Sequence, residues 1–173
     1  MTAPKQKDLE LFYFRITDIW KRLCEEHNTL LDQTCEEYSH LLGSELDELE
    51  KKLEAKRETI QRIHSLESHR TEIIKDLNAT ICKDSPIDSV SGLIDVMQPY
   101  EKRNDEKHLY RFNQLLIDII EKIQEQNRKN QQLINRTLCD LKNIREDAMG
   151  VKTYSTYDNH GGTKNVTIQN RQS

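Results

Sequence analysis

The N-terminal part of the chain, from Lys5 to Leu42, contains neither glycine nor proline. Within it, mostly apolar side chains recur at steps of three or four residues, which is the spacing of one face of an α-helix. The positions of this stripe are Leu9, Phe12, Ile16, Ile19, Leu23, His27, Leu30, Thr34, Tyr38 and Leu41. A helix with so long a stripe must cover it with another apolar surface, so the sequence predicts packed helices.

Gly43 and Ser44 interrupt the first stripe, and a second one follows them. Its positions are Leu46, Leu49, Leu53, Ile60, Ile63, Ile74 and Leu77. Ser44 followed by Asp47 resembles a capping box, so a second helix is expected to run from Ser44 to Asn78. The apolar period runs almost unbroken through Gly43, which leaves a single bent helix open. We favour an antiparallel hairpin, because one continuous rod could not cover its own stripe.

The segment after the second helix is punctuated by Pro86, Gly92 and Pro99. Residues 93–97 between these breaks predict one short helix. Pro99 is well placed as a first helical residue, and a third long helix is expected from Glu101 to Gly150. Its stripe comprises Leu109, Phe112, Leu116, Ile119, Ile123, Gln126, Asn130, Leu133, Thr137, Leu141 and Ile144.

Composition supports a thin, helical molecule. Apolar residues make up 35% of the 173 residues and charged residues 32%, which is too little apolar mass for a thick core. The predicted fold class is all-α: an elongated antiparallel helical hairpin or three-helix coiled-coil bundle, with one short extra helix. Residues 1–150 form the predicted helical domain. Residues 151–173 are rich in Thr, Asn, Gln and Gly and are expected to be a flexible, disordered tail.

Several functional classes lack support in the sequence. There is no phosphate-binding glycine loop, nucleophile elbow or spaced His/Cys/carboxylate metal motif, so we expect no enzyme, no cofactor and no metal. A formal net charge of −4 gives no reason to expect nucleic acid. The most apolar window is too short to insert into a membrane. A polar N-terminus and four scattered cysteines indicate a cytoplasmic protein.

The unequal helix lengths suggest where a partner could bind. The expected third helix exceeds the second by about 15 residues, or about 22 Å. An apolar stripe without a partner of equal length then falls near its end. Such a stripe usually marks an interface, and an amphipathic helix of another protein would complement it. Two alternatives remain open: the first helix covers the stripe, or the free protein homodimerises through it. The predicted binding residues are Asn127, Asn130, Leu133, Ile134, Leu138, Leu141, Ile144 and Met149.

Two tyrosines, Tyr154 and Tyr157, stand in the polar tail. Aromatic side chains in such a segment are typical anchors of a short recognition element, because tyrosine offers a large contact area at low entropic cost. The alternative is that they pack back on the helices.

The order of these features resembles one known family. The run from Asn127 to Leu138, followed by Gly150 and a Tyr157-x-x-x-Gly161 tail, is similar to the FlgN-like flagellar export chaperones. The earlier helices match only in type, and the tail is longer than expected.

This resemblance implies a cytosolic chaperone of flagellar type III secretion. Such a chaperone would bind the C-terminal helices of hook-associated proteins, prevent their premature assembly and deliver them to the cytosolic domain of a membrane export gate. By position, Tyr157, with Tyr154 and Gly161 as weaker candidates, would contact the gate. The alternative is a structural coiled-coil protein that homodimerises through the same stripe.

Overall fold

The computed structural model describes residues 3–83, 85–104, 107–149, 151–157 and 163–169, with side chains for 7–83, 85–102 and 107–149. Four helices follow in order: α1 (Ala3–Gly43), α2 (Leu46–Thr80), α3 (Val90–Asn104) and α4 (His108–Ala148). Two strands come after them, β1 (Val151–Tyr157) and β2 (Thr163–Gln169). The chain divides into two compact units, Met1–Arg128 and Lys129–Ser173, whose boundary lies inside α4. The all-α prediction for the body is confirmed.

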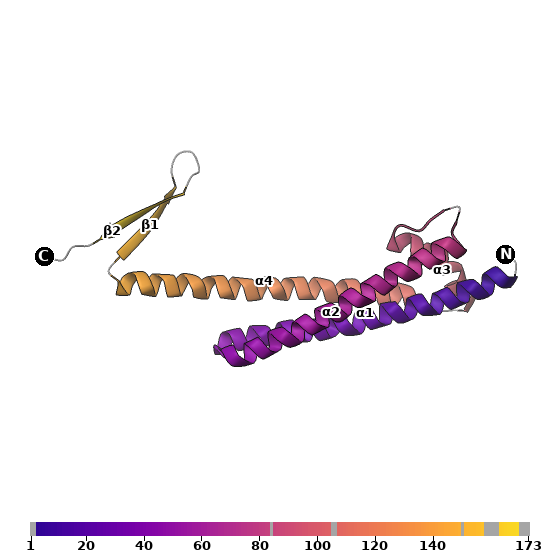
Figure 1. Cartoon of the computed structure of the whole chain (residues 1–173), viewed down its shortest axis with the longest axis horizontal. Helices are drawn as coiled ribbons and strands as arrows, with labels where there is room; N and C mark the ends of the chain where they lie inside the picture. The colour runs from indigo at the N-terminus through magenta and orange to yellow at the C-terminus, as the bar shows by residue number, and fades with distance from the viewer. Residues whose placement is uncertain (1–2, 84, 105–106, 150, 158–162, 170–173) are drawn as a thin grey trace. The chain divides into compact units, whose positions relative to one another are not determined.

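Helices α1 and α2 form an antiparallel hairpin, so the prediction of a hairpin rather than one bent helix is confirmed (Figure 1). The predicted capping role of Ser44 is wrong. Ser44 adopts a left-handed backbone with φ 55°, whereas a helix N-cap needs extended backbone. Glu45 takes the N-cap position instead, and α2 begins two residues later than expected.

The core of the first unit lies at the end of the hairpin far from this turn. Trp20 and Leu23 of α1, Leu77 of α2, Leu93 of α3 and Leu109 of α4 are completely buried there. Trp20 also donates its indole N–H to Asn113 on α4 at 3.3 Å. These helices therefore share one apolar centre built from the stripes that the sequence shows.

Ion pairs join the two helices of the hairpin along its length. Lys56 lies 2.6 Å from Glu37, with both side chains mostly covered, and Lys52 lies 2.7 Å from Glu36. These pairs link fixed positions on antiparallel helices, so they form only in this register of α1 against α2.

The predicted start of the last long helix is wrong. Pro99 lies inside α3, and α4 begins at His108, so it has 41 residues rather than about 50. Helix α3 continues through Pro99 because Met97, Tyr100 and Glu101 are all buried, and their burial outweighs the loss of one backbone hydrogen bond. The excess of α4 over α2, with 35 residues, is therefore six residues rather than about 15.

The two strands lie in the tail. They pair as an antiparallel hairpin, with Val151 opposite Gln169 and Tyr157 opposite Thr163. Both strands are rich in Val, Thr, Tyr or Ile, residues that favour extended backbone. Both strands are short and mostly polar, so the spacing of apolar residues does not mark them as strands in the sequence.

Candidate functional site

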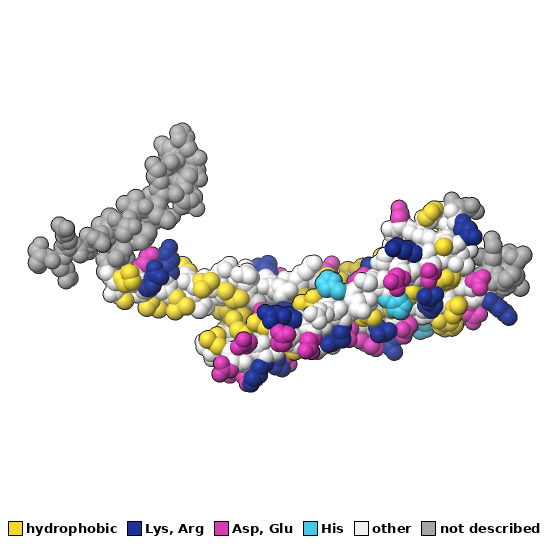
Figure 2. All heavy atoms as spheres, viewed as in Figure 1, with side chains coloured by type: hydrophobic (Ala, Val, Ile, Leu, Met, Phe, Trp, Pro, Cys, Tyr) yellow, Lys and Arg dark blue, Asp and Glu magenta, His cyan; other side chains and the backbone are white. Residues whose placement is uncertain are grey.

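An exposed apolar face runs along the last part of α4, where the sequence predicts partner binding. Leu138, Leu141 and Ile144 are 59%, 57% and 64% exposed, while Leu133 and Ile134 are half-buried. At 100° per residue, these five positions fall within an arc of about 140° around the helix. Figure 2 shows hydrophobic atoms gathered along this end of α4. The predicted stripe is thus one continuous surface.

Polar side chains occupy the rest of this helix. Lys142 and Glu146 form an ion pair at 3.8 Å one turn apart, and Gln131 donates to Asn135 at 3.0 Å. These contacts are local and exposed, so they keep the helix solvated without covering the apolar face. Met149, 61% exposed, follows the helix and donates its backbone N–H to the carbonyl of Arg145 at 3.0 Å.

The two predicted asparagines have separate environments. Asn127 is exposed and accepts a hydrogen bond from Lys56 at 3.4 Å, which joins it to the Lys56–Glu37 ion pair. Asn130 is 2% exposed and is engaged in contacts of its own. Sequence reasoning missed the role of Lys56, because a lysine on a charged helix gives no signal of burial.

The predicted tail residues are described only in part. Tyr154 and Tyr157 lie in β1, and their backbone is described but their side chains are not. Gly161 lies outside the described residues.

One open pocket of about 410 Å³ lies in the first unit, between α1 and α4. Its lining comprises Lys21, Cys24, Glu25, Asn28, Phe112, Leu115 and Ile119. Burial raises the pKa of the Cys24 thiol to about 11, and the nearby charge of Glu25 adds to the effect. The thiol therefore stays protonated at neutral pH and is a poor nucleophile.

Two properties of the described residues bear on other functions. Their side chains include no group of three or more His, Cys, Asp or Glu that could hold a metal ion. Within the same ranges, no helix is both long and apolar enough to cross a membrane.

Together these features define a class: a helical protein whose last helix leaves an apolar face uncovered. The particular family follows from comparison with known proteins. The model of the family described as FlgN protein matches residues 12–165, nearly the whole chain, and this protein therefore belongs to the FlgN family. That family is a family of flagellar export chaperones and not an enzyme family. No curated protein and no solved structure matches the chain.

Proposed function

We propose that this protein is a cytoplasmic chaperone that binds the C-terminal amphipathic helices of hook-associated proteins on the apolar face of α4. Leu133, Ile134, Leu138, Leu141 and Ile144 would form the binding face, with Met149 at its end. The observation that carries the proposal is the exposure of three large aliphatic side chains on one side of a helix in a family of flagellar chaperones.

Burial of this face supplies the driving force. A free amphipathic helix invites aggregation, and covering it removes apolar surface from water at about 25 cal/mol per Å². Fully burying a leucine is worth about 1.5–3 kcal/mol. Leu141 is already partly covered, so completing its burial would contribute about 1–2 kcal/mol.

Delivery to the export gate is assigned to the tail. Tyr157, with Tyr154 and Gly161 as secondary contacts, would bind the cytosolic domain of the gate protein. Both tyrosines belong to the segment Val151–Tyr157, next to the end of the helical body. Asn127 and Asn130 would act beside the binding face rather than within it, because one bonds Lys56 and the other is buried.

The test compares two variants of the same helix that add the same charge. Leu141→Asp places a carboxylate within the apolar face, whereas Asn143→Asp places one on its opposite side. We expect Leu141→Asp to weaken binding of a hook-associated C-terminal helical peptide at least about 100-fold, because a charge must be desolvated. Asn143→Asp should bind within about twofold of the original protein. Titration calorimetry measures both.

Tyr157→Ala separates the two surfaces. It should leave peptide binding unchanged and weaken binding to the purified cytosolic domain of the gate protein. If Leu141→Asp and Tyr157→Ala damage the same interaction, the two-surface proposal is wrong. Sedimentation at micromolar concentration tests the alternative: a tight dimer that no client helix displaces would favour a structural coiled-coil protein.

A further inference from the structure

The tip of the α1–α2 hairpin is a second exposed apolar surface, made of different residues from the face of α4. No side chain between residues 35 and 58 is buried, although the stripes of both helices continue through this segment. Leu42, at the end of α1, is 60% exposed, and Leu46, at the start of α2, is 71% exposed. Leu41 and Leu49 beside them are half-buried. This surface, which we call the hairpin tip, therefore has apolar groups that two helices alone do not cover.

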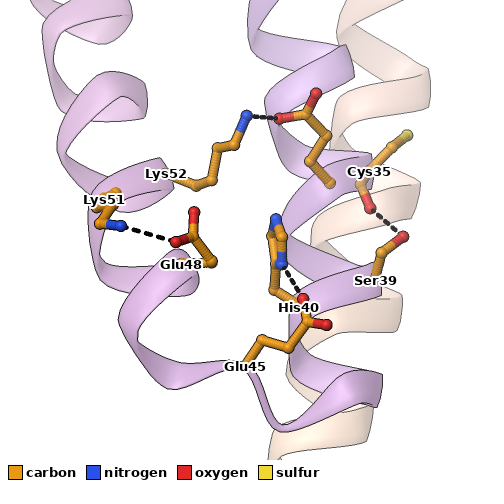
Figure 3. Close-up of polar contacts among 8 residues, drawn as sticks. Cys35, Ser39, His40, Glu45, Glu48, Lys51 and Lys52 are labelled. Carbon is orange, nitrogen blue, oxygen red and sulfur yellow. Dashed lines mark hydrogen bonds and ion pairs between the residues drawn. The ribbon is translucent and has the colours of Figure 1, made fainter.

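The turn holds these leucines in place. The backbone N–H of Glu45 donates to the carbonyl of His40 at 3.0 Å, and Ser44 keeps its left-handed conformation between the helices. The side chain of Glu45 also bridges the turn, with its Oε2 2.7 Å from Nδ1 of His40 (Figure 3). Leu42 and Leu46 thus flank a bonded turn and are displayed in a defined arrangement.

The hairpin tip is strongly acidic. Residues 35–58 carry eight acidic side chains and four basic ones, an excess of four negative charges that equals the formal net charge of the whole chain, −4. The acids are Glu36, Glu37, Glu45, Asp47, Glu48, Glu50, Glu54 and Glu58, and the bases are Lys51, Lys52, Lys56 and Arg57.

The basic side chains of the tip are already engaged with acids. They pair with Glu48, Glu36, Glu37 and Glu54, respectively, at 2.6–2.7 Å. Figure 3 shows the pair between Lys51 and Glu48 close to the turn. The remaining four acids therefore carry the excess negative charge, and Figure 2 shows acidic side chains around the hydrophobic atoms at this end of the hairpin.

We propose that the hairpin tip is a docking surface for a basic amphipathic helix of another protein. The leucines would pack against the apolar face of that helix, while its flanking Lys and Arg side chains would meet Asp47, Glu50 and their neighbours. Charge selects this occupant: a second copy of the tip and an anionic membrane surface would both be repelled by the same acids. The inference does not depend on the α4 face or on the tail.

The experiment uses the full chain and two synthetic helical peptides of about 20 residues with the same leucine face. One carries lysines beside the leucines, and its twin carries glutamates there. Fluorescence anisotropy should show saturable binding of the basic peptide, at least about tenfold tighter than that of the acidic twin. Raising the salt concentration from 50 to 500 mM should weaken it, because the contacts are exposed.

Variants then locate the site. Leu42→Ser with Leu46→Ser should weaken basic-peptide binding at least about tenfold, and these exposed positions leave folding intact. Asp47→Asn with Glu50→Gln should weaken it severalfold and reduce its salt dependence. The matched control is Ile117→Ser, which replaces an exposed aliphatic side chain on α4, away from the hairpin tip. This variant should bind the basic peptide as the original protein does.

Three results would overturn the proposal. The first two are that the basic peptide shows no saturable binding, and that the basic and acidic peptides bind equally tightly. The third is that Ile117→Ser weakens basic-peptide binding as much as Leu42→Ser with Leu46→Ser does. Leu141→Asp should leave this binding unchanged, so a failure here is distinguishable from a failure of the α4 proposal.

Discussion

Glu101 links three helices through one buried oxygen, and its replacement should reveal how the first unit is held together. Its side chain is 5% exposed and lies on α3. Its Oε1 accepts a hydrogen bond from the hydroxyl of Tyr13 on α1 at 3.2 Å and another from the backbone N–H of Leu109 at 3.0 Å. Leu109 is the second residue of α4, so its N–H is one of those that a helix start cannot bond internally.

The expected loss in the free energy of unfolding follows from these two hydrogen bonds. A hydrogen bond to a charged group contributes about 1.5–3 kcal/mol, so the loss of both bonds in Glu101→Ala should cost about 3–6 kcal/mol. Glu101→Gln keeps an oxygen acceptor, but neutral bonds are about half as strong and the favourable charge near the helix N-terminus disappears. We therefore expect a loss of about 1–2 kcal/mol for Gln. Tyr13→Phe removes one of the two donors and should cost about 1.5–3 kcal/mol.

Urea unfolding of the full chain, followed by circular dichroism, measures these differences. The expected order of stability is original protein, then Tyr13→Phe and Glu101→Gln, then Glu101→Ala. If Glu101→Ala costs less than about 1 kcal/mol, or if Gln is as damaging as Ala, the acceptor role of Glu101 is refuted.

Two further outcomes follow from single side chains. Because burial raises the pKa of Cys24 to about 11, this thiol stays protonated from pH 7 to 9 and should react with a chromogenic disulfide only after unfolding, whereas exposed Cys35 and Cys139 should react quickly. Labelling followed by peptide mass analysis checks this, and fast labelling of Cys24 in the folded protein would contradict it. Asn78 bonds both the N–H and the carbonyl of Ile87, at 2.8 and 2.9 Å, so Asn78→Ala should cost about 2 kcal/mol in urea unfolding. A loss below about 0.5 kcal/mol in Asn78→Ala would show that the paired bonds contribute little to stability.

Periodicity was sufficient to predict most of the helical body. Steps of three and four residues place Leu9, Ile16 and Leu23 on one face, and this face is buried in the structure. The same pattern located the exposed face of α4, because an apolar stripe is visible whether or not anything covers it. Whether Leu138 and Leu141 bind a client helix stays a prediction.

The sequence located the hairpin turn correctly, but the predicted role of Ser44 as an N-cap was wrong. Gly43 and Ser44 mark a break, yet the sequence does not show which residue leaves helical conformation. Ser44 does so in the left-handed region, which is uncommon for residues other than glycine.

Other features depend on contacts between residues distant in the chain, which local patterns do not contain. Pro99 signals a helix start, but buried Tyr100 and Glu101 keep α3 intact through it, and α4 starts only at His108. Lys56 reads as one more surface charge until packing brings it beside Glu37 and Asn127. Local spacing dictates which face of a helix is apolar, because that depends only on backbone geometry. Tertiary packing decides which polar groups are drawn inside, because their desolvation is offset only by partners that folding brings together.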